Sequence, residues 1–300
     1  MIKSKLKSTF YKKAPLLFPR YTNAKSKNLC VSTLFYHQGL EMSIYSITSF
    51  FYQIGYSLPV FAVEDGSLTP NDKKELTKHF NLTLLDAHHS ERKIEELFKR
   101  YPHLLKYRLS ASSPYTKRKF DALLLSPYSR LIFIEADVLF MSRPDEIVRW
   151  IKRKSKDFFY LVHDRNYLGS FKREDLDYSF RLLLDKCKFK IASPTFNAGI
   201  LCVPTIDRFD LTKLNKIFSY FNQVAYSNTI FAEETSLAIL YHDLKGKALP
   251  PKKYVCPVTF QEYHKATSKK VVALHYIGES KQLFVRDALK NTIMNKFYRF

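Results

Sequence analysis

Short apolar runs alternate with stretches of helical periodicity through the first half of the chain. Residues 29–34 form an apolar run typical of a strand, and residues 39–54 carry apolar side chains at helical intervals. This alternation predicts an α/β fold with a parallel, Rossmann-like sheet covered by helices on both faces. Further strands are predicted at 58–63, 82–85 and 130–134, and helices at 91–100, 116–125 and 69–80, the last starting with Thr69 as N-cap and Pro70.

The pattern becomes less regular after Asp137. The segment 164–194 matches neither period, and we interpret it as an insertion. No Pro- or Gly-rich linker occurs, so we predict one domain over residues 28–282, with a basic N-terminal arm at 1–27 and a basic amphipathic C-terminal tail at 283–300. In the second half, helices are predicted at 144–151, 211–221 and 233–241, and strands at 158–162, 199–203 and 271–275.

The chain has a formal charge of +21, and the N-terminal arm contains no acidic residue. Such a charge attracts polyanions: nucleic acid, an anionic membrane or a phosphate-bearing substrate. A basic surface that only contacts water explains much of it equally well. A nucleic-acid-binding protein would interleave basic and aromatic residues, whereas aromatic residues here lie in apolar runs such as Phe50-Phe51-Tyr52. We therefore expect no nucleic-acid partner.

The four cysteines are widely spaced and include no Cys-x-x-Cys pair, which disfavours a zinc finger or a redox motif. We expect them to be buried, reduced thiols. The chain lacks a run of about 18 apolar residues, and its basic N-terminus lacks the apolar region of a signal peptide. We therefore expect a cytoplasmic protein, with peripheral contact to an anionic membrane as an option for the tail.

Two carboxylates, Glu135 and Asp137, directly follow the apolar strand predicted at 130–134. Ligands of open α/β sheets gather at the carboxyl ends of strands. Buried carboxylates there are costly unless they are paired or bind a metal, and they suit Mg²⁺ or Mn²⁺. An acid-x-acid tripeptide is usually a solvated turn, but its place after a core strand favours a metal site.

The stretch Phe133-Ile134-Glu135-Ala136-Asp137 resembles the Asp-x-Asp motif of retaining GT-A glycosyltransferases, in the family of glycogenin and the lipopolysaccharide galactosyltransferases. The resemblance implies that Asp137 binds a divalent cation directly. Glu135 replaces the first aspartate of the family, which keeps the carboxylate but changes its reach to the metal or to the donor ribose.

A second resemblance lies near the C-terminus, where His275, Gly278 and Lys281 match the family's His-x-x-Gly-x-x-Lys signature. A neutral imidazole is a metal ligand, glycine lets the backbone approach a phosphate, and lysine stabilises the leaving diphosphate. The resemblance therefore completes a metal site of Glu135, Asp137 and His275.

Two further motifs stand in the family's order along the chain. The segment Phe196-Asn197-Ala198-Gly199 resembles the family's Phe-Asn-x-Gly, in which Asn contacts the donor sugar. Glu233 and Glu234 stand where the family has an acid at a helix start, although acids also favour that position for the helix dipole. The resemblance implies catalytic roles for Glu234 and Asn197, and donor contacts for Asn197 and Gly199.

Donor binding would extend to the N-terminal half. Arg118 lies in a segment that resembles the family's basic segment before the acidic strand, and Ser32 and Thr33 end the strand that holds the nucleotide base in the family. With Glu135, Gly278 and Lys281, they complete the expected donor-binding set. His163 and Asp164 follow another predicted strand and are assigned no chemistry.

Together the resemblances imply a GT-A fold with a Rossmann-like mixed sheet. They also imply transfer of a hexose from a nucleotide-diphosphate sugar, with UDP-sugar the expected donor, to a saccharide or glycolipid acceptor with retention of configuration. The 164–194 insertion would then lie on the acceptor side. A catalytically silent GT-A-like binding protein is the main alternative, with Glu135 as its indication. An inverting GT-A enzyme and a nucleotidyltransferase are further alternatives. A nucleotidyltransferase would need a Gly-rich basic loop after the first strand, and Tyr36-His37-Gln38-Gly39 does not supply one.

Overall fold

A computed structural model describes residues 11, 20–24, 26–110, 114–163, 188–205, 207, 209–224 and 231–297. Most of the predicted N-terminal arm, most of the predicted insertion, Asp164 and Cys187 lie outside these residues. No helix in the described ranges is long and apolar enough to cross a membrane. Cys30, Cys202 and Cys256 are free and buried, as predicted.

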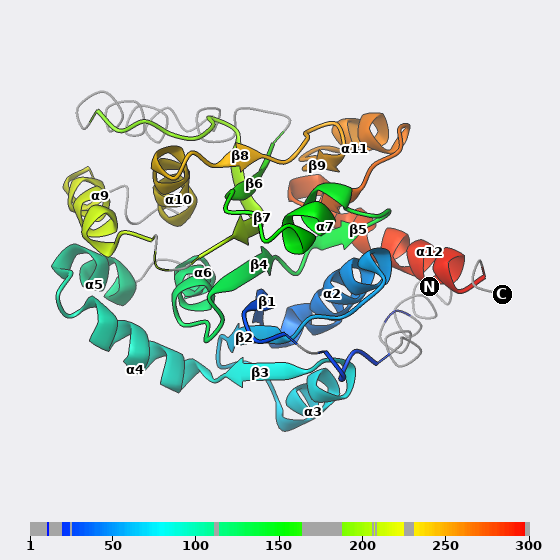
Figure 1. Cartoon of the computed structure of the whole chain (residues 1–300), viewed down its shortest axis with the longest axis horizontal. Helices are drawn as coiled ribbons and strands as arrows, with labels where there is room; N and C mark the ends of the chain where they lie inside the picture. The colour runs from blue at the N-terminus through cyan, green and yellow to red at the C-terminus, as the bar shows by residue number, and fades with distance from the viewer. Residues whose placement is uncertain are drawn as a thin grey trace.

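The centre of the molecule is a seven-stranded mixed sheet (Figure 1). Its order is β3-β2-β1-β4-β7-β6-β8. The first four strands in this order are parallel, which confirms the parallel sheet predicted for the first half; β7 then runs antiparallel to both β4 and β6, and β8 parallel to β6. The strands are β1 (Leu29–Phe35), β2 (Val60–Glu64), β3 (Leu82–Leu85), β4 (Arg130–Ile134), β6 (Phe159–Val162), β7 (Phe196–Val203) and β8 (Lys247–Ala248).

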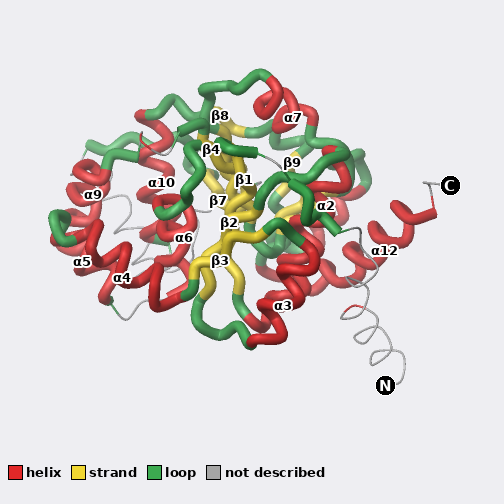
Figure 2. Tube along the Cα trace, turned by 60° about the horizontal axis from the view of Figure 1, so that its bottom comes forward, coloured by secondary structure: helices red, strands yellow, loops and turns green. Residues whose placement is uncertain are grey.

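Helices cover both faces of this sheet, as Figures 1 and 2 show. Within β4, Leu131 and Phe133 pack into one core and Ile132 and Ile134 into the other, so the strand is apolar throughout because both faces are buried. The first core contains α4 (Ala87–Phe98), α5 (Pro102–Leu109), α6 (Pro114–Leu124), α9 (Leu211–Gln223) and α10 (Ala232–Asp243), and the second contains α2 (Leu40–Ile54), α3 (Pro70–His79) and α7 (Asp145–Lys152).

The start of α3 follows the predicted chemistry. The Thr69 hydroxyl accepts from the backbone N–H of Asp72 at 3.2 Å, and the Asp72 carboxylate accepts from the Thr69 N–H at 2.7 Å. This reciprocal capping box, with Pro70 in the first turn, satisfies donors that have no partner within the helix. The N-cap prediction for Thr69 is confirmed.

A second, three-stranded sheet contains β5 (Val138–Phe140), β10 (Ala273–His275) and β9 (Tyr254–Val255). Because β10 runs antiparallel to β5 with His275 opposite Val138, it brings the C-terminal region beside the end of β4. Of this sheet, the sequence predicted β10, as the strand at 271–275, but not β5 or β9, and it did not predict α5. Strands as short as β5 and β9 carry no period. Around the sheet lie α11 (Phe260–Thr267), the 3₁₀ helix η5 (Gly278–Leu283) and α12 (Phe284–Phe297), the described part of the predicted tail.

Candidate active site

A cavity of about 480 Å³ opens beside the carboxyl end of β4. Its lining includes four carboxyl groups, two lysines and two histidines, so ionisable groups of both signs are concentrated at this end of the strand. The polar side chains that line it are Tyr36, Gln38, Lys119, Glu135, Asp137, His163, Asn197, Glu233, Glu234, His275 and Lys281.

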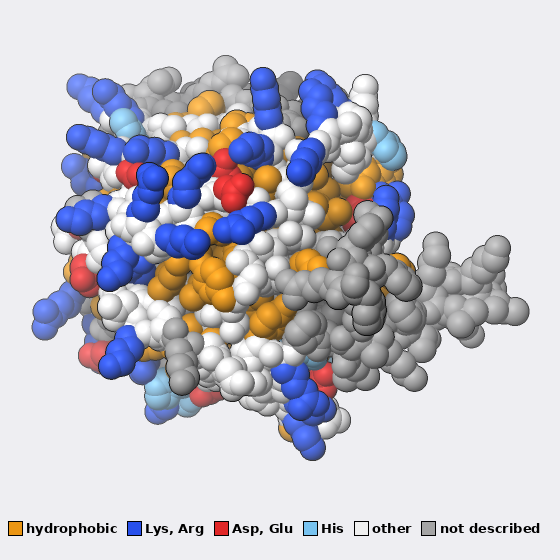
Figure 3. All heavy atoms as spheres, turned by 45° about the vertical axis from the view of Figure 1, so that its right-hand side comes forward, with side chains coloured by type: hydrophobic (Ala, Val, Ile, Leu, Met, Phe, Trp, Pro, Cys, Tyr) orange, Lys and Arg blue, Asp and Glu red, His pale blue; other side chains and the backbone are white. Residues whose placement is uncertain are grey.

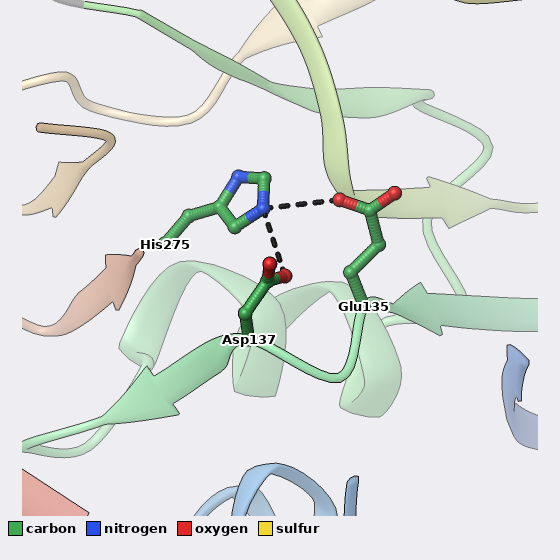
Figure 4. Close-up of side chains that lie close together, drawn as sticks. All are labelled: Glu135, Asp137 and His275. Atoms are coloured by element: carbon green, nitrogen blue, oxygen red, sulfur yellow. Dashed lines mark hydrogen bonds and ion pairs between the residues drawn. The ribbon is translucent and has the colours of Figure 1, made fainter. Parts of the chain in front are cut away.

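Glu135, Asp137 and His275 converge in this cavity (Figure 4). The His275 Nε2 lies 3.0 Å from a Glu135 carboxylate oxygen and 3.1 Å from an Asp137 carboxylate oxygen. Their possible ligand atoms all lie within 4.8 Å of one another. The strand pairing explains this meeting: Glu135 and Asp137 lie in the turn between β4 and β5, and His275 ends the strand that pairs with β5.

The geometry and chemistry of these three groups fit a divalent cation. An octahedral ion with ligands at about 2.1 Å holds adjacent ligand atoms about 3 Å apart, which matches both distances from the imidazole to the carboxylates. Two carboxylates and one imidazole suit Mn²⁺, and the carboxylates also suit Mg²⁺. Among the described residues, Glu135, Asp137 and His275 therefore form a group that could hold a metal ion.

Two lysines contact the outer oxygens of these carboxylates. Lys119 Nζ lies 2.8 Å from Glu135, and Lys281 Nζ lies 2.9 Å from Asp137. Burial would raise the pKa of the Glu135 carboxyl, but Lys119 and the hydrogen bond from His275 outweigh it and lower the pKa below its usual value. Burial would lower the pKa of Lys119, but the neighbouring carboxylates outweigh burial and raise the pKa. Both groups are therefore charged at neutral pH.

Lys119 was not among the residues assigned from the sequence. It follows Arg118, and successive side chains on a helix diverge by about 100°. Lys119 consequently lines the cavity, whereas Arg118 is buried elsewhere and donates to the Ser90 hydroxyl at 3.1 Å and the Glu64 carbonyl at 3.3 Å. The basic segment does contribute a side chain to the cavity, but which of its members does so depends on the register of the helix, which only the tertiary structure shows.

Asn197 and Glu234 lie next to the proposed metal ligands. The Glu234 Oε1 accepts from Asn197 Nδ2 at 3.2 Å and from the backbone N–H of Ala198 at 3.0 Å. Burial raises the pKa of Glu234, although Lys119 opposes it. Burial also raises the pKa of Glu233 to about 8, again against Lys119, whose Nζ lies 3.5 Å away. Both glutamates therefore belong to the site.

Ser32 and Thr33 do not line the cavity. Their hydroxyls are buried and donate to the Ala122 and Ile134 carbonyls, both at 2.7 Å. Leu34, from the same strand, and Gln38 line it instead.

The two glycines of the motifs make close packing possible. A Cβ on Gly199 would lie 2.4 Å from the His275 Nδ1, so this glycine makes room for the imidazole. Gly278 has a φ of 52°, and a Cβ there would lie 2.9 Å from the Val258 carbonyl oxygen. Gly199 thus allows the main chain to pack against the His275 ring, and Gly278 allows it to pack against the Val258 carbonyl.

Several solved glycosyltransferase structures have a similar fold. Galactosyltransferase LgtC, in complex with donor and acceptor sugar analogues, matches with a TM-score of 0.56 and 12% identity over 91% of this chain and 96% of LgtC. Mouse xyloside xylosyltransferase 1 in its apo form matches with a TM-score of 0.52 and 12% identity over 83% of this chain and 96% of that one. The chain has the GT-A glycosyltransferase fold.

The GT-A fold predicted from the motifs is therefore confirmed. The bifunctional glycosyltransferase WbbM in its apo form is also similar, with a TM-score of 0.54 and 13% identity over 91% of this chain and 51% of WbbM. No protein-family model matches the chain. No curated protein matches it either. At these identities the GT-A likeness concerns the fold, and the chemistry is argued from the side chains in the cavity.

Proposed function

We propose that the chain is a metal-dependent glycosyltransferase that moves a hexose from a nucleotide-diphosphate sugar, with UDP-sugar as the expected donor, to a saccharide or lipid-linked acceptor. The convergence of Glu135, Asp137 and His275 in one cavity of a GT-A fold carries the proposal. A divalent cation, Mn²⁺ or Mg²⁺, would offset negative charge on the two phosphates of the departing nucleotide.

Each neighbouring side chain then has a role that its position supports. Lys281, with its ammonium group beside Asp137, would add positive charge where the diphosphate leaves. Glu234 would face the donor sugar, with Asn197 beside it, and the carboxylate of Glu234 would stabilise the positive charge that develops at the anomeric carbon. Leu34 and Gln38, rather than Ser32 and Thr33, would lie closest to the nucleotide base.

Retention of configuration follows from the family resemblance. An acceptor hydroxyl would attack the anomeric carbon from the face that the diphosphate leaves, and the departing phosphate oxygen would take up the hydroxyl proton. No covalent attachment of the sugar to the protein is required on this route. NMR of the product formed from a donor of known anomeric configuration tests the stereochemistry.

Incubating purified protein with UDP-hexoses and Mn²⁺ tests the function directly. Release of UDP that depends on Mn²⁺ and disappears in Asp137→Ala supports the proposal. UDP release that is unchanged in Asp137→Ala removes the metal role. Mn²⁺ and nucleotide binding without any turnover would favour the alternative of a catalytically silent GT-A-like protein, for which the replacement of aspartate by Glu135 is the specific observation.

We also propose peripheral contact with an anionic membrane, where a lipid-linked acceptor would be found. Figure 3 shows Lys and Arg side chains outnumbering acidic ones on one face of the molecule. Separately, the helix α12 exposes Arg286 and Lys290 and buries Phe284. Cosedimentation with phosphatidylserine vesicles tests this: Lys290→Glu should bind less, whereas Lys106→Glu on α5 makes the same charge change and should bind like wild type. Equal binding of all three proteins contradicts a role for α12.

A further inference from the structure

The side-chain amide of Asn197 has an orientation that its neighbours determine. The backbone N–H of Gly199 can only donate, and the atom it contacts at 2.9 Å is therefore the amide oxygen of Asn197. The same oxygen lies 2.8 Å from the Nδ1 of His275. Since an amide oxygen can only accept, Nδ1 of His275 carries a proton in this arrangement.

This proton determines which imidazole nitrogen is available to a cation. With Nδ1 protonated, the lone pair of a neutral His275 is on Nε2, the nitrogen that faces Glu135 and Asp137. The Sγ of Cys256 also lies 3.3 Å from Nδ1, but the amide oxygen is the nearer and stronger acceptor. Histidines that bind metals generally need such a partner for the second nitrogen.

The opposite end of the same amide contacts the other half of the site. Its Nδ2 donates to Glu234 at 3.2 Å and to the Nε2 of His163 at 3.0 Å. Asn197 thus uses two acceptor and two donor interactions, which is the full capacity of an amide. It is 4% exposed, so none of these partners is readily replaced by water.

We propose that Asn197 is a positioning residue that holds His275 in the tautomer with a free Nε2 and, through its other end, holds the Glu234 carboxylate beside the donor sugar. The inference rests on the proposed metal site and adds to it the group that joins the metal ligand to the carboxylate. It predicts that the two ends of the amide can be separated by substitution. Aspartate keeps an oxygen for His275 but cannot donate to Glu234, and alanine removes both interactions.

Mn²⁺ binding without nucleotide, measured by EPR of the free ion, separates the two ends. Asn197→Ala should bind Mn²⁺ about 10- to 100-fold more weakly than wild type. Asn197→Asp should retain most of the Mn²⁺ affinity and yet lose transfer activity, because two carboxylates then face each other at Glu234. Asn215→Ala is the matched control, since the Asn215 side chain caps α5 away from the cavity, and it should bind Mn²⁺ like wild type.

The outcomes distinguish this inference from the proposed function. If wild-type protein does not bind Mn²⁺ while His275→Ala behaves identically, the metal site and the inference fall together. If wild type binds Mn²⁺ and His275→Ala does not, but a folded Asn197→Ala binds as tightly as wild type, the positioning role alone is wrong. Equal loss of Mn²⁺ affinity in Asn197→Asp and Asn197→Ala would likewise overturn it, because the retained oxygen would then have no effect.

Discussion

His275 Nε2 lies 3.1 Å from the Asp137 carboxylate, although 138 positions separate the two residues in the chain. Beside it, the backbone N–H of Tyr276 donates to the Asp137 carbonyl at 2.9 Å. The side-chain contact is thus supported by the main chain, since Tyr276 directly follows the strand that pairs with β5. A rigid main chain at this point keeps candidate ligands together before any ion binds.

Replacing Asp137 should abolish metal-dependent donor turnover. Asp137→Ala removes one ligand atom and leaves Lys281 without its carboxylate, so we expect UDP release to fall at least about 100-fold. The matched control is Asp145→Ala, because Asp145 pairs with Arg143 on the surface and should turn over like wild type. UDP release in an Mn²⁺ titration measures both, and equal rates in the two variants would contradict the assignment.

Replacing Lys119 should lower the stability of the protein as well as its activity. Lys119→Met removes the ammonium group that the buried Glu233 shares with Glu135, while Glu135 keeps its contact with His275. We expect the free energy of unfolding to fall by about 3 kcal/mol at pH 8. The loss should shrink at pH 5, where unpaired carboxylates take up protons. Urea unfolding measures it, with Lys99→Met as control: Lys99 pairs with Glu96 on the surface, and its loss should change stability by less than about 1 kcal/mol.

His163 should make stability depend on pH. Burial lowers the pKa of His163 to about 3, against about 6.5 in an unfolded chain. Between these values the unfolded state binds a proton that the folded state does not, so stability falls as pH falls, by up to about 1.4 kcal/mol per pH unit. Urea unfolding from pH 7 to 4.5 should show a shallower dependence for His163→Gln than for wild type. Parallel curves would contradict a lowered pKa of His163 in the folded protein.

Glu234 and the metal ligands should differ in which property they control. Glu234→Gln keeps an oxygen that can accept from Ala198 but removes the negative charge, so transfer should fall by about 100- to 1,000-fold while Mn²⁺ affinity stays close to wild type. His275→Ala should reduce both properties. Transfer rates and Mn²⁺ binding measured on the same preparations distinguish the two roles, and full activity in Glu234→Gln would exclude a need for its charge.

Gly199 gives a steric test of the same centre. A methyl group there would lie 2.4 Å from the His275 Nδ1 and 2.9 Å from the Asn197 oxygen, so Gly199→Ala should displace the imidazole and weaken Mn²⁺ binding about 10-fold or more. Circular dichroism checks that the variant is folded. Unchanged Mn²⁺ affinity in the folded variant would mean that His275 does not ligate the ion.

Much of the fold could be predicted because many of its helices and strands depend on residues that are close together in the chain. The strands at 82–85 and 130–134 have the predicted bounds. The second of them is apolar because both of its faces are buried. The same locality explains the confirmed helix start at Thr69. By contrast, β9 and β5 have two and three residues, too few for any period, and α5 follows α4 after only three residues.

The sequence by itself determined which chemical groups end the core strands: Glu135 and Asp137 after β4, and His275 at the end of β10. Only the tertiary structure decided which of them meet. The pairing of β5 with β10 brings His275 to Asp137, the register of α6 chooses Lys119 over Arg118, and the packing at Gly199 lets Asn197 reach His275. The physical reason is that the patterns of burial and helix capping involve near neighbours in the chain. These contacts join residues that are far apart in the chain, and no pattern among neighbouring residues predicts which of them meet.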